Sequence, residues 1–181
     1  GATLINSTGA PPLGPVDIVI ENNIITKIQN VGYPGVPINN SRRPKLSNGG
    51  VEIDCEGSYI LPGFIDTHGH IGGRSQGASP EYVFNLWMAH GITTIREPGG
   101  SLSQKLKLEL KNSSKKNEII APRIYSFSTF NSRVKSPDEA REWVRKNAKE
   151  GSDGIKFFGA PPDIMEAAIK ENKKIGLRST A

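Results

Sequence analysis

Cysteine and histidine are both scarce in this chain, and each shortage narrows the chemistry that it can carry. Cys55 is the only cysteine among 181 residues. A single thiol cannot form an internal disulfide, and it excludes a metal site built from several thiolates. The chain has three histidines, His68, His70 and His90. A site that uses more than one imidazole must therefore include His68 or His70.

Long hydrophobic runs are also absent, which bears on location. No apolar run approaches the ~20 residues that a membrane-spanning helix needs, and no N-terminal segment has the charged-then-apolar pattern of a signal peptide. With 35% hydrophobic and 23% charged residues, the composition is that of a soluble globular protein. We therefore expect no membrane partner. Because the chain starts at Gly1 rather than Met, the sequence leaves open both a cytoplasmic location and export followed by removal of a leader.

The chain carries a moderate excess of positive charge. The net charge is +5, and much of it lies in SRRPK, at 41–45, and KNSSKKN, at 111–117. Both stretches lie in polar or Gly/Asn/Ser/Pro-rich surroundings without interleaved aromatic residues, so they indicate solvated loops rather than a nucleic-acid surface. We expect no nucleic-acid partner, and a nucleic-acid-binding module is the least favoured function.

The first third of the chain is typical of a small β-sheet. Residues 16–30 are rich in β-branched residues and are interrupted by Asn22-Asn23, a pair that tolerates positive φ, which predicts a hairpin. Residues 32–50 are crowded with Gly, Pro and Asn and predict a long surface loop. Residues 51–60 alternate apolar and polar side chains and predict a third, half-exposed strand.

From residue 62 the pattern changes to strands alternating with helices. Predicted strands start near residues 64, 92, 123, 154 and 175, and predicted helices fall near 79–91, 102–110, 136–151 and 161–174. This βα spacing is typical of a parallel sheet with covering helices. Such a sheet either closes as a (β/α)8 barrel of the TIM type or stays open and doubly wound. No Gly-rich phosphate-binding fingerprint follows the first strand, so we favour the barrel, with only about its first half present.

Two of the three histidines lie one residue apart in PGFIDTHGH, at 62–70. If this stretch is a strand, His68 and His70 share a face, with Cα atoms ~6.6 Å apart. They would then lie at the C-terminal end of the first βα strand, where barrel enzymes carry their active sites. Two convergent imidazoles suit a metal ion. An H-x-H pair also arises by chance, with both rings hydrogen-bonded in a loop, and the spacing alone leaves both interpretations open.

The combination of LPGFIDTHGH, opening a βα series, and GITTIREPGG, after the first helix, resembles the amidohydrolase superfamily of metal-dependent hydrolases. The likeness is greatest to imidazolonepropionase-related members and similar dipeptidases. It implies a (β/α)8 barrel beside a β-sandwich assembled from both chain ends. It also implies hydrolysis of amide, cyclic amide or peptide-like C–N bonds by a water activated on one or two divalent ions, most often zinc. Residues 1–61 then correspond to a sandwich portion and 62–181 to the first half of the barrel.

The resemblance also implies a set of metal ligands. His68 and His70 match the family's first-strand ligands, and Lys156, in SDGIKFFG, matches a fourth-strand lysine that is carboxylated and bridges two metals. A bare ammonium pointing into an apolar barrel is costly, whereas its carbamate is an anion suited to two cations. The alternative is a lysine whose ammonium reaches solvent at the barrel rim.

Four other polar residues near these ligands have less certain roles. His90 precedes Gly91 at a helix C-terminus, and we interpret it as structural. Asp66 is either an acceptor that orients a ligand histidine or a buried structural carboxylate. Arg96 and Glu97, at the end of the second strand, either line the pocket or pair with each other.

The family's remaining ligands, histidines on the fifth and sixth strands and a general-base aspartate on the eighth, have no counterpart here. The chain ends inside or just after the predicted fifth strand, so we assign no catalytic residue and expect the base beyond the C-terminus. We expect an N-terminal portion that needs the rest of a longer chain, or a second polypeptide, to complete the barrel. The expected substrate is a small molecule or short peptide, and we expect a homo-oligomer. The alternative function is a non-catalytic structural or partner-binding subunit.

Overall fold

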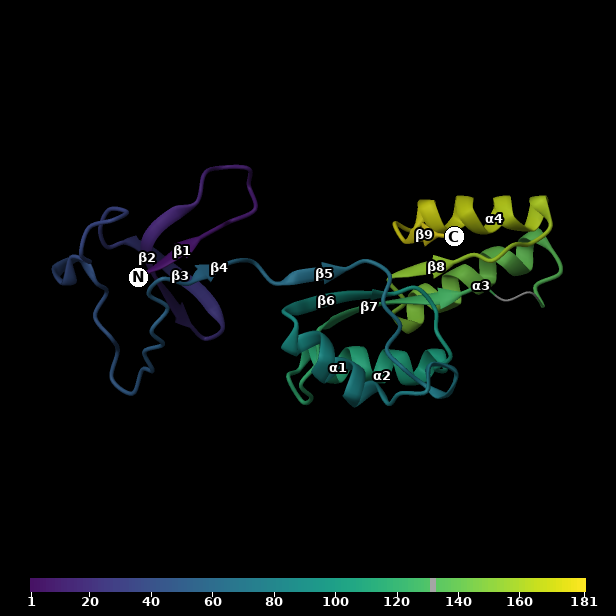
Figure 1. Cartoon of the computed structure of the whole chain (residues 1–181). Coiled ribbons are helices and arrows are strands. Elements are labelled where there is room, and N and C mark those ends of the chain that lie inside the picture. The colour runs from purple at the N-terminus through teal and green to yellow at the C-terminus, as the bar shows by residue number, and fades with distance from the viewer. Residues whose placement is uncertain (131–132) are drawn as a thin grey trace. The chain divides into compact units, whose positions relative to one another are not determined.

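The computed structural model describes residues 1–130 and 133–181 (Figure 1). They form two compact units, Gly1–Pro62 and Gly63–Ala181. The assignment of 1–61 as a sandwich portion and 62–181 as half of a barrel stays a prediction. None of the helices in the described ranges has the length and apolar character needed to span a membrane.

The first unit is built on a four-stranded sheet with the order β3-β2-β1-β4. Its strands are β1 (Ala2–Leu4), β2 (Leu13–Glu21), β3 (Ile24–Asn30) and β4 (Tyr59–Ile60), with a short 3-10 helix, η1 (Asn40–Arg42). β2 and β3 pair antiparallel, and the turn between them holds Asn22 at φ 50 and Asn23 at φ 63. This confirms the predicted hairpin, because a two-residue turn of this kind requires positive φ at both positions.

The predicted strand at 51–60 is mostly wrong. Only Tyr59 and Ile60 pair, in parallel with β1, and the segment before them is irregular. Val51 and Ile53 are 84% and 79% exposed. The alternating pattern predicts a strand only where one face is buried, and here the apolar side chains find no such face. The sequence also gave no sign of β1, whose three residues are too few for a periodic pattern.

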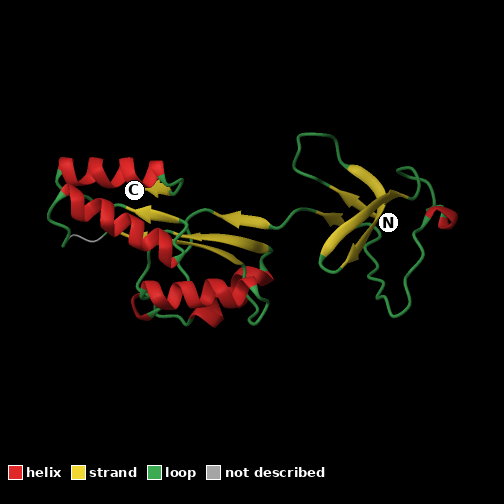
Figure 2. Cartoon of the chain, turned by 180° about the vertical axis from the view of Figure 1, so that it is seen from behind, coloured by secondary structure: helices red, strands yellow, loops and turns green. Residues whose placement is uncertain are grey.

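The second unit is a curled, parallel, five-stranded sheet with helices between its strands (Figure 2). Its strands are β5 (Phe64–Asp66), β6 (Ile92–Glu97), β7 (Arg123–Thr129), β8 (Gly154–Lys156) and β9 (Arg178–Thr180). Its helices are α1 (Pro80–Ala89), α2 (Gln104–Lys115), α3 (Pro137–Glu150) and α4 (Pro162–Lys174), with a short 3-10 helix, η2 (Arg74–Gln76). The strands lie in the sheet in their sequence order. A doubly wound sheet reverses its order at a switch point, and these five strands contain no such reversal.

The helix ends follow the predicted capping signals. The Ser79 hydroxyl accepts from the backbone N–H of Tyr82 at the start of α1, and the Ser136 hydroxyl accepts from that of Glu139 at the start of α3. Gly151 ends α3 at φ 103, a conformation that favours glycine. These local hydrogen bonds depend on residues close in sequence, so the sequence was sufficient to place them.

One face of the sheet packs on the helices and the other does not. Ile95 and Ile124 pack with α1 and α2 in one apolar cluster, and Ile155 packs with α3 and α4 in another. Alternate strand residues point to opposite faces. The side chains of Arg96 on β6 and Lys156 on β8 therefore project from the face away from the helices.

Candidate metal centre

His68 and His70 follow β5 rather than lying on it, because the strand ends at Asp66. The prediction that they share a strand face is therefore wrong. β5 is the edge strand of the sheet, and Phe64 and Ile65 are 57% and 65% exposed, so no outer neighbour extends the pairing. Asp66 Oδ1 accepts from the backbone N–H of His68 at 2.9 Å, a local bond typical of a turn.

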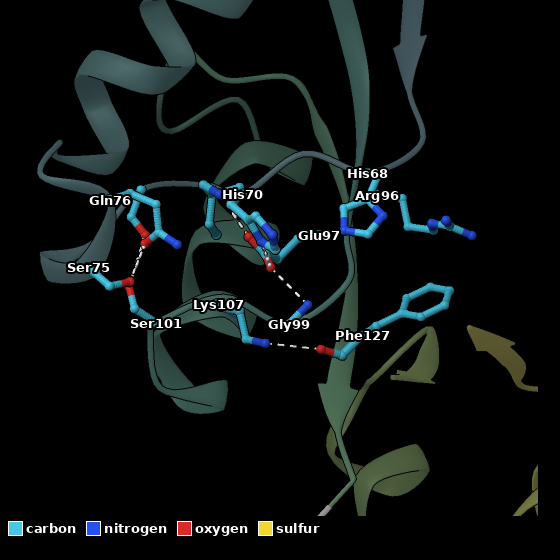
Figure 3. A network of polar contacts seen from close by, with 12 residues as sticks. His68, His70, Ser75, Gln76, Arg96, Glu97, Gly99, Ser101, Lys107 and Phe127 are labelled. Atoms are coloured by element: carbon cyan, nitrogen blue, oxygen red, sulfur yellow. Dashed lines mark hydrogen bonds and ion pairs between the residues drawn. The ribbon is translucent and has the colours of Figure 1, made fainter. Parts of the chain in front are cut away.

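The two imidazoles nevertheless lie side by side. Their ring centroids are 5.5 Å apart, and the ring planes are nearly perpendicular, at 86°. His68 is exposed and His70 is half-buried. Figure 3 shows both rings beside the end of β6. A loop thus brings together the donors that the strand was expected to align.

Glu97 holds His70 from the neighbouring strand. It is the last residue of β6 and is fully buried. Its Oε1 lies 3.2 Å from His70 Nδ1 and accepts from the backbone N–H of Gly99 at 2.9 Å, and its Oε2 accepts from that of Ile71 at 2.7 Å (Figure 3). The carboxylate therefore links the loop after β5 to the loop after β6. Sequence reasoning left this role unassigned.

Arg96 does not pair with Glu97. Its Nε donates to the carbonyl oxygen of Thr67, and its guanidinium carbon lies 5.5 Å from the centroid of the Phe127 ring. Neighbouring strand residues point to opposite faces, so strand alternation was the signal that separated these two side chains.

The two other polar residues near the histidines have local contacts. Asp66 accepts from the backbone of His68 rather than from an imidazole, so its contact is that of a structural carboxylate. His90 caps the C-terminus of α1, and its Nδ1 lies 2.7 Å from the carbonyl oxygen of Leu86. That contact agrees with a structural role for His90.

Lys156 is the last residue of β8 and is only 7% exposed. Its ammonium nitrogen lies 5.1 Å from the centroid of the Phe158 ring. Within the described part of the chain, this nitrogen donates no hydrogen bond and forms no ion pair. The ammonium therefore has no anionic partner among the described residues, and its role as a metal ligand stays a prediction.

The glycines after β6 allow the chain to pass closely between His70 and Lys156. A Cβ on Gly100 would lie 3.3 Å from His70 Nδ1 and 3.2 Å from Glu97 Oε1. Gly99 has φ 103, and a Cβ there would collide with Thr129 Oγ1 and lie 3.7 Å from Lys156 Cβ. A side chain at either glycine would thus crowd its neighbours.

We expect Gly99→Ala to destabilise the fold by about 2–4 kcal/mol, from backbone strain together with the collision. Gly159→Ala is the matched control, because Gly159 also has positive φ, at 135, but nothing lies within 4 Å of its Cβ position. Strain alone should cost it about 1–2 kcal/mol. Urea denaturation measures the free energy of unfolding of both variants. Equal losses of stability in Gly99→Ala and Gly159→Ala would contradict the close approach at Gly99.

His68 and His70 supply some, but not all, of the ligands that a metal ion needs. In the described ranges, no group of three or more His, Cys, Asp or Glu side chains is placed to hold a metal ion. Two imidazoles suit zinc, which usually takes four ligands. Because His70 Nδ1 faces a carboxylate, its Nε2 is available to a ligand. The two histidines thus fit a metal but do not complete its coordination.

Known proteins resemble this chain in sequence over a short segment. The chain matches no protein-family model. It is 52% identical over 44 residues to adenine deaminase 2 of Desulfotalea psychrophila and 41% identical over 44 residues to an adenine deaminase of Halalkalibacterium halodurans. Each match covers 24% of this chain and 7% of the deaminase.

Solved structures resemble nearly the whole chain. A Bifidobacterium longum protein assigned as a prolidase has a TM-score of 0.72 and 20% identity, and it matches 98% of this chain. A bottromycin amidohydrolase has a TM-score of 0.71 and 17% identity, and a Xaa-Pro dipeptidase has 0.60 and 20%. The chain covers 47%, 36% and 54% of these three proteins.

These relatives are of one type, and they agree with the motifs and with the order of the parallel strands. The curated relatives are deaminases, and the structural relatives are named as dipeptidases or as an amidohydrolase. The chain is thus similar to proteins of the amidohydrolase type in fold, over nearly its whole length, and to adenine deaminases in sequence, over 44 residues.

Proposed function

We propose that this chain forms part of a metal-dependent hydrolase that cleaves amide, cyclic amide or peptide-like C–N bonds. The observation that carries the proposal is the perpendicular pair of His68 and His70, placed after the first strand of a parallel sheet wound in sequence order. The names of the relatives, deaminases and dipeptidases, support a reaction at a C–N bond. The substrate would be a small molecule or a short peptide.

In this proposal the protein side chains hold and orient the metal. A divalent ion, zinc by donor type, would supply a water that attacks the scissile carbonyl. His68 and His70 would bind that ion, and Lys156, as a carbamate, would bind it together with a second. The general base is not assigned to any residue of this chain.

We also propose that the (β/α)8 barrel is completed by strands outside these residues, in a longer chain or a second polypeptide. The sheet ends at β5 and β9 without closing. In the first unit, Ile20, Ile25 and Ile28 are exposed, as expected for a sheet face that further strands of a sandwich would cover. The chain spans about half the length of two structural relatives. A homo-oligomer stays a prediction.

The test is calorimetric titration of the chain with Zn²⁺ after EDTA treatment. We expect saturable binding, and at a free zinc concentration of 100 times Kd a gain in stability of about 2.7 kcal/mol. EDTA should reverse the gain. The absence of zinc binding, with the fold intact by circular dichroism, would refute a metal site in this chain.

A non-catalytic, partner-binding subunit is the second candidate. It is favoured by the lack of a third His, Cys, Asp or Glu ligand beside the two histidines in the described ranges. Such a subunit would bind its partner without zinc. The same titration, repeated with the completed protein and followed by a dipeptide hydrolysis assay, separates the two functions.

A further inference from the structure

The buried carboxylate of Glu97 accepts from three directions. Its partners are His70 Nδ1, the backbone N–H of Ile71 and the backbone N–H of Gly99. An ionised carboxylate only accepts hydrogen bonds. The proton of a neutral His70 must therefore lie on Nδ1, which leaves the lone pair of Nε2 free.

Among the described residues, neither His68 nor His90 has a carboxylate bonded to its ring. No hydrogen bond from the His68 ring to any described residue fixes its tautomer. His90 Nδ1 faces the carbonyl oxygen of Leu86 at 2.7 Å, so His90 also carries its proton on Nδ1, but at the exposed end of α1. His90 therefore offers an internal reference for the tautomer of His70.

Lys107 is a second buried charged residue in this region. Lys107, on α2, is 2% exposed, and its Nζ donates to the carbonyl oxygen of Phe127 at 3.0 Å (Figure 3). Burial lowers the pKa of Lys107, and the negative charge of Glu97 opposes that shift.

We propose that Glu97 is a positioning residue that fixes the Nδ1–H tautomer and the ring orientation of His70, and so keeps Nε2 free for the metal. The claim that Nε2 is kept free for the metal rests on the proposed function. The claim about the tautomer of His70 does not, because it can be tested on the metal-free chain.

The variant Glu97→Gln tests whether Glu97 orients His70 or only fills space. The glutamine amide has nearly the same shape as the carboxylate, so packing should be kept while the hydrogen bonds change. A glutamine side chain has one acceptor oxygen and one NH2 donor, whereas three donors point at this position. If the oxygen keeps the short bond to Ile71 N–H, the NH2 group takes the place of Oε1 and faces both His70 Nδ1 and the N–H of Gly99. His70 must then accept at Nδ1 and carry its proton on Nε2, where it blocks a metal.

The first measurement is ¹⁵N NMR of the metal-free chain, at a pH about two units above the usual histidine pKa of ~6.5. We expect His70 to show the same Nδ1–H pattern as His90, and Glu97→Gln to move His70 toward the Nε2–H pattern while His90 does not change. An Nε2–H pattern for His70 in the unmodified chain would overturn the proposal, and so would an unchanged pattern in Glu97→Gln.

The second measurement is zinc affinity by calorimetry, where loss of the partner of a ligand typically costs 10–100-fold. We expect Glu97→Gln to weaken zinc binding by about that factor. Glu171→Gln is the matched control, because Glu171 is also buried but bonds to Arg145 on α3, and it should leave zinc affinity unchanged. Equal zinc affinity in Glu97→Gln and the unmodified chain would refute the positioning role. Absence of zinc binding in the unmodified chain would refute the proposed function while the NMR result still tests the tautomer.

Discussion

Zinc binding is expected to be lost when His68 and His70 are both replaced by alanine. The two ring centroids lie 5.5 Å apart, and two adjacent imidazoles suit zinc. Removing both should weaken binding by more than the ~10–100-fold expected for loss of a ligand's supporting partner. Elemental analysis and calorimetry of the double variant measure the effect.

The control for this double variant is His90→Ala. His90 is exposed at the end of α1 and, on our interpretation, binds no metal, so its zinc affinity should match that of the unmodified chain. Because His68 is exposed and His70 is half-buried, the double variant should still fold. Unchanged zinc content in a folded double variant would refute the assignment of both histidines.

The sequence predicted best the features that depend on near neighbours. Ser79 and Ser136 each cap a helix through a backbone N–H three residues away, and Asn22-Asn23 form a turn that only a few residue types allow. The order of the five parallel strands also followed from the spacing of the βα units. In each case the determining interaction lies within one element or between consecutive elements.

The predictions failed where an outcome depended on what lies beside a segment. β5 ends early because it is an edge strand, and Val51 and Ile53 do not form a strand because no surface covers them. His68 and His70 still lie side by side, although the strand face from which we paired them is absent, since a tight loop also places residues two apart near each other.

Glu97 illustrates the other kind of failure. Its contact with His70 joins residues 27 apart in sequence, through the parallel pairing of β5 with β6. No periodicity or local motif encodes such a contact. Its position at the end of a strand, before Pro98-Gly99-Gly100, marked Glu97 as a polar residue at the functional edge of the sheet but did not identify its partner.

Lys156 is expected to become carboxylated when both zinc and bicarbonate are present. Its side chain is largely buried, and its ammonium has an aromatic ring but no anion beside it in the described ranges, so carboxylation breaks no ion pair there. In the reaction the neutral amine attacks the carbon of CO₂, an N–C bond forms, and the amine proton is lost to solvent. The product is an anion, which two nearby cations would stabilise.

This prediction is tested with ¹³C-labelled bicarbonate and ¹³C NMR. A carbamate resonance should appear when zinc is added and should be absent in Lys156→Met. Lys111→Met is the control, since the Lys111 ammonium donates to the carbonyl oxygen of Gly151 and pairs with Asp153, away from the histidines, and it should keep the resonance. A zinc-loaded chain without the resonance would mean that Lys156 is unmodified. The two histidines would then hold a single ion, because an unmodified ammonium repels a second cation rather than bridging to it.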